Sequence, residues 1–512
     1  MKIEIFLSKN KFCIYLVLFI QSLILLESHN KIQIDILFDQ GYLWYGVQRV
    51  ISGEVPIRDF SSYDLGRYYL IANAINFIGI NNYFTFRLAL GLVQLFGIST
   101  ALILISRKLD LFKKEDILYL IVTTVTITTW MFIPNRAFEA SIPIIQILVF
   151  THLIDKKTIN SYFIGGLCIG ISAVFGRNFG VYSLFAGLII IGYVGTYKNI
   201  NKNFIYKLII FFIGIIIGFS PIIFFSILNI DFLNAFILSV KKIFEFGQTN
   251  ISQQVPWPWL VFSIKMPIVA SIRYLIIGIL FVGLLIFPLI IGTVIIIKKI
   301  QCKNLDPLIV TTGIFSIPYA HFAFSRADLD HLADGIFPLL IGVIILISML
   351  SNYKKILAIF FLCIISIFIT YDRHPAFYCF SGCKEINIGN NNFITNDITF
   401  KILNKINSIL EKNPQDSHDF YAIQLPGLYS IFESQSPTYE TYQLLPVRPE
   451  LEDLEIVKLK KYKPHVLFYL NNVVDNPDFS FNTTHPRIFR YLNNNFYLID
   501  SSLPFITIYR NK

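Results

Sequence analysis

The chain has 512 residues, of which 54% are hydrophobic and only 15% are charged. A soluble protein carries about 25% charged residues, and many stretches here reach the roughly 20 apolar residues that cross a bilayer. The composition therefore excludes a soluble enzyme. The formal net charge is +10, but the Lys residues lie in short loops between apolar runs. That distribution is typical of a membrane protein and argues against nucleic acid as a partner.

The apolar runs predict a polytopic α-helical membrane protein with about eleven transmembrane helices. The first run follows Lys2, Lys9 and Lys11 and has no small-x-small cleavage site after it, so we expect a retained anchor. The expected spans are 12–28, 84–106, 117–133, 138–154, 160–176, 178–196, 205–229, 271–297, 306–324, 332–350 and 356–371.

Basic residues between these spans predict the orientation. With the N-terminus in the cytoplasm, every inside loop is basic, as the positive-inside rule requires. The residues are Arg107, Lys108, Lys113 and Lys114, then Lys156 and Lys157, then Lys198, Lys202 and Lys207, then Lys298, Lys299 and Lys303, then Lys354 and Lys355. A further crossing at 67–81 would reverse all these loops, so we expect that apolar stretch to lie in the outer interface.

The parts expected outside are the loop 29–83, the segment 230–270 and the tail after Tyr371. We therefore predict a membrane domain, 1–371, which includes the loop 29–83, and a small extracytoplasmic α/β domain, 372–512. In the tail, the expected helices are 398–411 and 450–462, the expected strands are 465–470, 496–499 and 505–509, and the Asn-rich stretches 389–392 and 493–495 are expected loops.

Two cysteines of the tail, Cys379 and Cys383, are four residues apart in a segment expected to face an oxidising compartment. A disulfide is predicted there, with two free thiols as the alternative. No cysteine or histidine spacing indicates a metal site, and no P-loop, strand-linked GxGxxG or HExxH motif is present.

The candidate chemistry gathers in the segment 38–70, where acids, arginines and aromatic residues are interleaved. Acidic residues beside a bilayer are costly unless they are solvated, paired or used. Asp39 follows the first span by some ten residues, and the aromatic stretch Gly41–Ile51 is expected to lie on the membrane and hold it there. A solvated loop acid is the alternative interpretation.

The motifs of this segment resemble those of GT-C superfamily glycosyltransferases, and most of all the bacterial members related to protein O-mannosyltransferases and aminoarabinose transferases. The resemblance runs along most of the chain. It rests on DQGYL at 39–43, GEVPIRDF at 53–60, GRYY at 66–69, GISAVFGRNFGVY at 170–182, SRADLDH at 325–331 and LPGLYSIFESQSPTYETY at 425–442. Gln40 stands where an acid is common in that family, so dependence on a divalent metal is left open. Ile57 stands where Tyr is usual.

The resemblance implies transfer of a sugar from a polyprenyl phosphate to an acceptor hydroxyl, with inversion, on the extracytoplasmic face of a bacterial inner membrane. Asp39 is then the expected catalytic base, with Asp59 as a second acid that orients the acceptor or the loop. The cations expected to bind the donor phosphate are Arg58, Arg67, Arg177, Arg326 and His331. The expected partners are the lipid-linked donor, membrane lipids and a lipid, glycan or protein acceptor. No cofactor is implied by the resemblance beyond a possible divalent metal.

Two other classes compete with a glycosyltransferase. A transporter or flippase of lipid-linked sugars predicts inverted repeats and ionisable groups at the bilayer midplane, and the sequence has neither. A non-catalytic scaffold that displays the tail leaves the acids and arginines of the segment 38–70 unexplained.

Overall fold

The computed structural model describes residues 14–27, 32–33, 35–195, 202–246, 251–374, 379, 382–413, 419–471 and 479–512. The chain forms two compact units, each built from separate stretches of sequence. The first comprises 1–29, 91–228 and 252–374, and the second comprises 30–90, 229–251 and 375–512. The contacts thus group the segment 30–90 with the tail. The predicted domain boundary after residue 371 stays a prediction.

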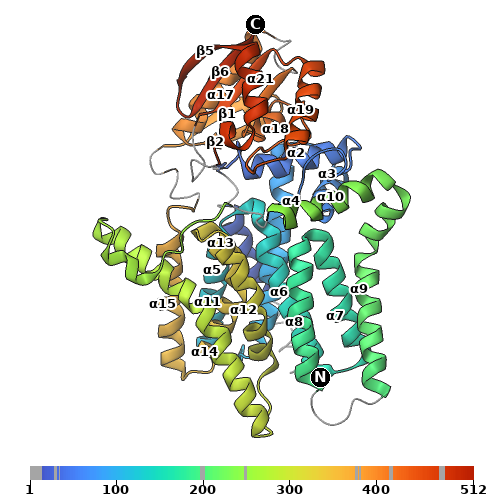
Figure 1. Cartoon of the computed structure of the whole chain (residues 1–512). Coiled ribbons are helices and arrows are strands. Elements are labelled where there is room, and N and C mark those ends of the chain that lie inside the picture. The colour runs from blue at the N-terminus through green and yellow to red at the C-terminus, as the bar shows by residue number, and fades with distance from the viewer. Residues whose placement is uncertain are drawn as a thin grey trace. The chain divides into compact units, whose positions relative to one another are not determined.

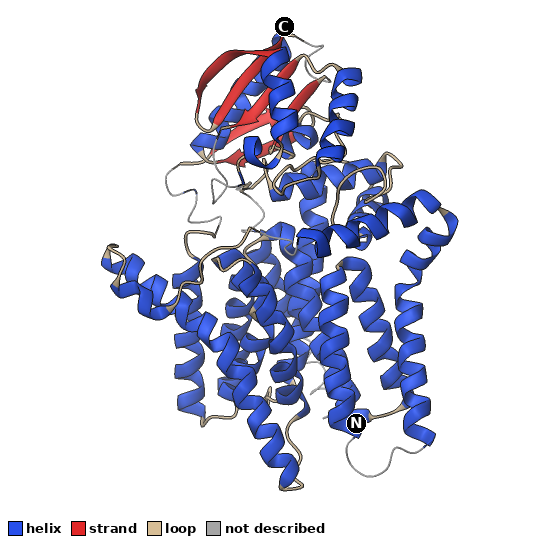
Figure 2. Cartoon of the chain, in the orientation of Figure 1, coloured by secondary structure: helices blue, strands red, loops and turns tan. Residues whose placement is uncertain are grey.

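Helices are the regular elements of the first unit in its described residues (Figure 2). It contains a helix over Ile14–Glu27 and most of α4 (Tyr83–Ser106). The other elements are α5 (Lys114–Trp130), η1 (Pro134–Arg136), α6 (Ala137–Lys156), α7 (Ile159–Phe175), α8 (Arg177–Gly195), α9 (Lys202–Leu228), η2 (Pro258–Phe262), α11 (Ile268–Ile300), α12 (Pro307–Ser325), α13 (Leu329–Gly335), α14 (Phe337–Ser348) and α15 (Asn352–Thr370).

Each expected span coincides with helix in the part of the chain that the structure describes. Seven described helices are long and apolar enough to cross a membrane, and α13 with α14, which meet at a 63° bend, make an eighth if they form one span. The chain is therefore an integral membrane protein, but the count of eleven crossings is not confirmed. The helix Ile14–Glu27 and α7 are apolar yet shorter.

Small residues set the packing of α7 against α9, which lie side by side in Figure 1. A methyl group on Gly166 would overlap the carbonyl of Phe211, and one on Gly218 would overlap the carbonyl of Leu167. Both helices carry glycines four residues apart, Gly166 with Gly170 and Gly214 with Gly218. Within a bilayer, this small-xxx-small pattern lets two helix backbones approach closely and gain van der Waals contact.

A buried ion pair joins the first turns of α5 and α15. The ammonium group of Lys355 contacts the Asp116 carboxylate, and both side chains are nearly inaccessible to solvent. The second oxygen of Asp116 accepts a hydrogen bond from the backbone N–H of Asp110 at 2.7 Å. Because a buried charge without a partner is costly, this pair fixes how the two helix ends meet.

The second unit begins with α2 (Asp39–Ile51) and α3 (Leu65–Ile78) and takes in α10 (Ile230–Phe246). The stretch 41–52, which was expected to be amphipathic, is helical except for its last residue. All eight residues from Gln40 to Val47 are buried. The burial leaves these turns no apolar face for a membrane surface, contrary to the expectation. The stretch 67–81 is mostly helix α3, which is too short to be a candidate span, and its place at the interface stays a prediction.

The tail holds the strands of the described chain, shown in red in Figure 2. β3 (Phe420–Ile423), β4 (Val466–Leu470), β6 (Ile506–Asn511) and β5 (Phe496–Leu503) form one sheet in that order. β3 and β4 are parallel, and the other pairings are antiparallel. The helices of the tail are α17 (Asp397–Lys412), α18 (Gly427–Ile431), α19 (Pro449–Tyr462), α20 (Phe481–Thr484) and α21 (Pro486–Asn495). The predicted α/β character of the tail is confirmed.

Apolar side chains and one buried acid hold α21 on this sheet. Leu459, Ile488 and Leu492 pack with sheet residues into one core. The Glu452 carboxylate of α19 accepts hydrogen bonds from the backbone N–H groups of Arg487, at 2.7 Å, and Ile488, at 3.0 Å. An anion at a helix N-terminus satisfies N–H groups that have no partner within the helix, so α19 caps α21.

The Asn-rich stretches of the tail are loops only in part: residues 389 and 390 form a turn, but the other residues belong to regular elements, so the expectation is wrong for those. Residues 391 and 392 begin β2 (Asn391–Thr395), which pairs with β1 (Lys384–Ile388), and residues 493–495 end α21. Gly389 has a φ of 55° and opens the two-residue turn between β1 and β2. A Gly-Asn pair is suited to such a hairpin turn because both positions favour or tolerate positive φ.

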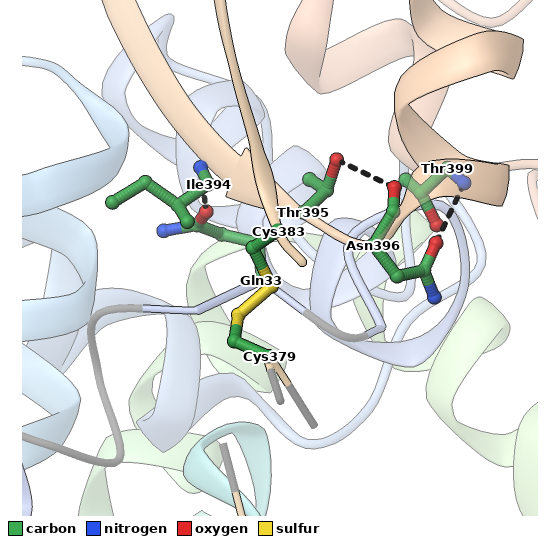
Figure 3. Close-up of a disulfide and its surroundings, with 7 residues drawn as sticks. All are labelled: Gln33, Cys379, Cys383, Ile394, Thr395, Asn396 and Thr399. Atoms are coloured by element: carbon green, nitrogen blue, oxygen red, sulfur yellow. Dashed lines mark hydrogen bonds between the residues drawn. A yellow bond between two sulfur atoms is a disulfide. The ribbon is translucent and has the colours of Figure 1, made fainter. Parts of the chain in front are cut away.

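The predicted disulfide is formed, between Cys379 and Cys383 (Figure 3). It precedes β1 directly, and β2 is in turn tied to the start of the second unit. The backbone N–H of Gln33 donates to the Ile394 carbonyl at 2.9 Å, and the Gln33 side chain accepts from the Ile394 N–H. Asn396 caps α17, since its side chain accepts from the Thr399 N–H at 2.7 Å.

Candidate active site

Asp39 is the first residue of α2. A carboxylate in the first turn is favoured by the helix dipole, and the next residues hold the helix in place. The hydroxyl of Tyr42 donates to the Ser61 carbonyl at 2.7 Å, and the backbone N–H of Ser436 donates to the Tyr45 hydroxyl at 3.0 Å. The helix that carries Asp39 is therefore tied to the segment 53–62 and to the tail.

Gln40 fills the position where the family commonly has an acid, and its side chain has a different task here. Its carbonyl oxygen accepts from the Tyr83 hydroxyl, which in turn accepts from the Arg87 guanidinium at 3.1 Å. Among the described residues, no group of three or more His, Cys, Asp or Glu is arranged to hold a metal ion.

The segment after α2 contains a strained residue at its centre. Ile57 has a φ of 72°, which is rare for a β-branched side chain. Its N–H donates to the Phe60 carbonyl at 3.0 Å and to the Ser62 hydroxyl at 2.8 Å, and its carbonyl accepts from the Tyr439 hydroxyl. Strained conformations persist where the surroundings fix them, and they cluster at functional sites.

Arg58 and Asp59 bind each other. The Arg58 guanidinium contacts the Asp59 carboxylate through two hydrogen bonds of 2.8 and 2.7 Å, and the Val55 N–H also donates to Asp59, at 2.8 Å. The hydrogen bond from Arg58 lowers the pKa of Asp59, against the effect of partial burial. A carboxylate that is already saturated with donors is a weak proton acceptor.

Arg67 lies in the first turn of α3 and is 6% exposed. Its guanidinium lies over the Tyr63 ring, 5.2 Å from the centroid. Tyr68, also on α3, is fully buried and accepts a hydrogen bond from the Tyr63 N–H at 3.0 Å. The structure thus gathers Asp39, Arg58, Asp59 and Arg67 into the second unit, where Arg58 and Asp59 are in direct contact.

The other predicted cations belong to the first unit, and two of them share one acid. Asp328 caps α13 by accepting from the His331 N–H, and the same carboxylate oxygen is 2.8 Å from Nδ1 of the His331 ring. Its second oxygen is 2.7 Å from Nε of Arg326. Burial raises the pKa of Asp328, but the bonds from His331 and the charge of Arg326 outweigh it and hold the pKa well below its usual range. Asp328 is therefore an anion that orients both side chains.

Two further arginines lie at helix ends of the first unit. Arg177 is the first residue of α8, directly after Gly176 ends α7. Arg136, at the end of η1, forms an ion pair with the buried Asp334 of α13. The sequence gives no local indication that Arg136 pairs with Asp334, because the two residues are 198 positions apart.

This arrangement defines a class of membrane protein. It combines apolar helices and a segment of acids and arginines after the first helix with a small α/β tail. Among solved structures, the chain is similar along 97% of its length to ArnT from Cupriavidus metallidurans bound to undecaprenyl phosphate, with 98% of that chain covered, a TM-score of 0.54 and 12% identity. The chain has the fold of ArnT.

Other comparisons add less. The oligosaccharyltransferase from Archaeoglobus fulgidus tethered with an acceptor peptide has a TM-score of 0.45 and 9% identity, with 97% of this chain and 74% of that chain covered. No protein-family model matches the sequence, and no curated protein matches it either.

Proposed function

We propose that this chain is a membrane glycosyltransferase that moves a sugar from a polyprenyl phosphate to an acceptor hydroxyl, with inversion. The observation that carries the proposal is the fold, which follows ArnT over nearly the whole of both chains, and ArnT was solved with undecaprenyl phosphate. The lipid tail of such a donor stays in the bilayer, so its phosphate reacts at the interface. The proposed location is a bacterial inner membrane with the α/β tail outside.

Asp39 is the proposed base. Its carboxylate takes the proton of the acceptor hydroxyl while the hydroxyl oxygen attacks the anomeric carbon of the donor sugar. The bond from that carbon to the phosphate oxygen breaks, and the polyprenyl phosphate leaves with the electron pair. Attack opposite the leaving group inverts the anomeric configuration. Asp59 is engaged by Arg58, which supports a role in orienting the loop or the acceptor rather than a second base.

Arg326 and His331 are the proposed partners of the departing phosphate, with Arg177 behind them. Preorganised cations stabilise charge that develops in the transition state without further reorganisation. Asp328 holds both side chains in fixed positions, which is the property that such a site requires. Arg58 and Arg67, which belong to the second unit, are proposed to bind the head group of the donor.

The proposal is tested with reconstituted protein and a set of polyprenyl-phosphate donors that carry a hexose, a pentose or an amino sugar. The wild type should release polyprenyl phosphate from at least one of them, and Asp39→Asn should lose about 10² to 10⁴-fold in rate. Asp155→Asn, at an exposed acid near the end of α6, is the matched control. No release from any donor would refute the class, and near wild-type transfer by Asp39→Asn would remove Asp39 from the mechanism.

A further inference from the structure

The second unit contains a cavity that the sequence did not indicate. Its volume is about 590 Å³, within the range of roughly 300–1,000 Å³ that is usual for ligand sites. Four parts of the unit surround it: the segment 57–62, one face of α10, the segment 438–448 and α19. Tyr421, Gln443 and His485, which are buried, lie among its inner residues, while Leu238 and Leu454, which are exposed, lie at its rim.

Glu440 is the central polar group of this cavity. Its carboxylate oxygens are 3.5 Å from Nζ of Lys242 and 3.5 Å from Nε2 of His485. The His485 ring is fixed from its other side, because Nδ1 is 2.8 Å from the Thr484 hydroxyl. Both contacts of Glu440 are at the long end of hydrogen-bond distances, and a carboxylate has about four acceptor positions. It can therefore accept further hydrogen bonds from a ligand.

Charges around the cavity cancel in pairs. Lys242 faces Glu440, Lys458 is 3.0 Å from Glu455, and Arg448 is 3.8 Å from Glu245. Arg58, the fourth lining cation, is held by Asp59 outside the cavity. A phosphate would need a surplus of cations and an ammonium group a surplus of acids. Donors and acceptors in alternation suit hydroxyl groups, each of which donates and accepts.

Eight aliphatic side chains also line the wall. They are Ile57, Ala235, Leu238, Val447, Leu451, Leu454, Val457 and Ile488. The same helix α10 that contributes Leu238 also exposes Ile237 and Phe244. The buried lining residues Tyr421, Gln443 and His485 are polar, and exposed apolar side chains of α10 and α19 lie at the rim beside the charged pairs. This arrangement matches an amphiphile whose head enters first and whose chain leaves over α10.

From this geometry we infer that the cavity binds a neutral, hydroxyl-rich head group carrying an aliphatic chain, as in a glycolipid. The inference rests on the proposed function, in which such a molecule is the acceptor. The cavity is linked to the segment of Asp39 within the same unit. Ser61, whose carbonyl accepts from Tyr42 of α2, also donates its N–H to the Tyr439 carbonyl at 2.8 Å, and both Ser61 and Tyr439 line the cavity.

The test is photolabelling of the full-length protein in phosphatidylcholine nanodiscs. The probe is an alkyl glucoside with a diazirine on its chain, and labelled peptides are mapped by mass spectrometry. Label is expected on α10 and α19. Octyl glucoside should compete for it, whereas octyl sulfate, octyltrimethylammonium and free glucose should not. Better competition by the sulfate or the ammonium compound, or label spread evenly over the lipid-facing helices, would overturn the inference.

Variants of cavity residues test whether the probe is bound in the cavity when it labels the protein. Glu440→Gln removes a charged acceptor, so labelling at low probe concentration should fall about tenfold, while Glu450→Gln, at an exposed acid of α19 outside the cavity, should not change it. Leu238→Trp fills the rim from an exposed position and should abolish labelling without affecting folding. Full labelling of Leu238→Trp would refute the site. The experiment needs no donor and no turnover, so its failure is distinguishable from failure of the transfer assay.

Discussion

Gly41 of α2 and Gly427 of α18 lie in direct backbone contact. A methyl group on Gly41 would overlap Gly427, and a methyl group on either residue would overlap the carbonyl oxygen of Ile36. The N–H of Gly427 also donates to the Leu37 carbonyl at 3.0 Å. The two glycines come from motifs almost 390 positions apart, DQGYL and LPGLYSIF, and their contact joins the helix of Asp39 to the tail.

This contact predicts a stability effect. Gly41→Ala and Gly427→Ala should each lower the free energy of unfolding by about 1–3 kcal/mol, because the added methyl group has to displace backbone atoms. Gly292→Ala, at a helical position where a Cβ meets nothing within 4 Å, is the control and should unfold at the wild-type temperature or above. The measurement is thermal unfolding in detergent, followed by intrinsic fluorescence. Unchanged unfolding of both variants would contradict the close contact.

The helices were predictable because their signal is local. An apolar run of the necessary length predicts a helix wherever it lies, and the amphipathic pattern of 398–411 in the tail predicts α17 in the same way. The glycine contacts were not predictable. Gly41 belongs to a sequence motif, but no residue near it in the sequence indicates that it packs against Gly427. The short strand β3 was missed for a related reason, since it is four residues long and fully buried and has no alternation to reveal it.

Because Lys355 and Asp116 form a buried ion pair, substitutions at the two positions should have strongly coupled effects on the free energy of unfolding. Asp116→Asn should lower the free energy of unfolding by about 3–5 kcal/mol, because it leaves the buried Lys355 ammonium unpaired. The amide can still accept from Asp110, so the lost charge is the main change. Adding Lys355→Met should restore much of the stability. Lys354→Met, at the exposed neighbour, is the control for loss of a positive charge. Additive losses in the double variant would contradict the coupling.

The site was predictable in its components but not in its pairings. Arg326 and His331 were expected as phosphate ligands from one motif, SRADLDH, and the same motif supplies Asp328, which orients both. A capping acid three residues before a helical histidine is a local pattern, and it could have been recognised. Glu440, Lys242 and His485 lie in three separate segments, and only the folded chain brings them together.

Arg326 supplies the prediction for the leaving group. Arg326→Ala should lower turnover about 10² to 10³-fold, as expected for the loss of one preorganised donor in the transition state. Arg326→Lys should recover part of the rate, since an ammonium group replaces the charge but not the planar fork of donors. Arg107→Ala, at an exposed arginine outside any proposed site, should transfer sugar at the wild-type rate. Equal rates for the Ala and Lys variants would remove Arg326 from phosphate binding.

The orientation can be tested with a cysteine that the chain already has. Cys302 is free and exposed between α11 and α12, in a loop predicted to face the cytoplasm because Lys298, Lys299 and Lys303 surround it. A membrane-impermeant maleimide should therefore label it only after spheroplasts are permeabilised, and Cys302→Ser should remove that signal.

A cysteine at Ser501, exposed in β5 of the tail, should be labelled in intact spheroplasts, since the tail is predicted to be outside. The two probes should thus respond oppositely to permeabilisation. Labelling of Cys302 in intact spheroplasts, with protection of the cysteine at position 501, would reverse the orientation and move Asp39 to the wrong face for an extracytoplasmic donor.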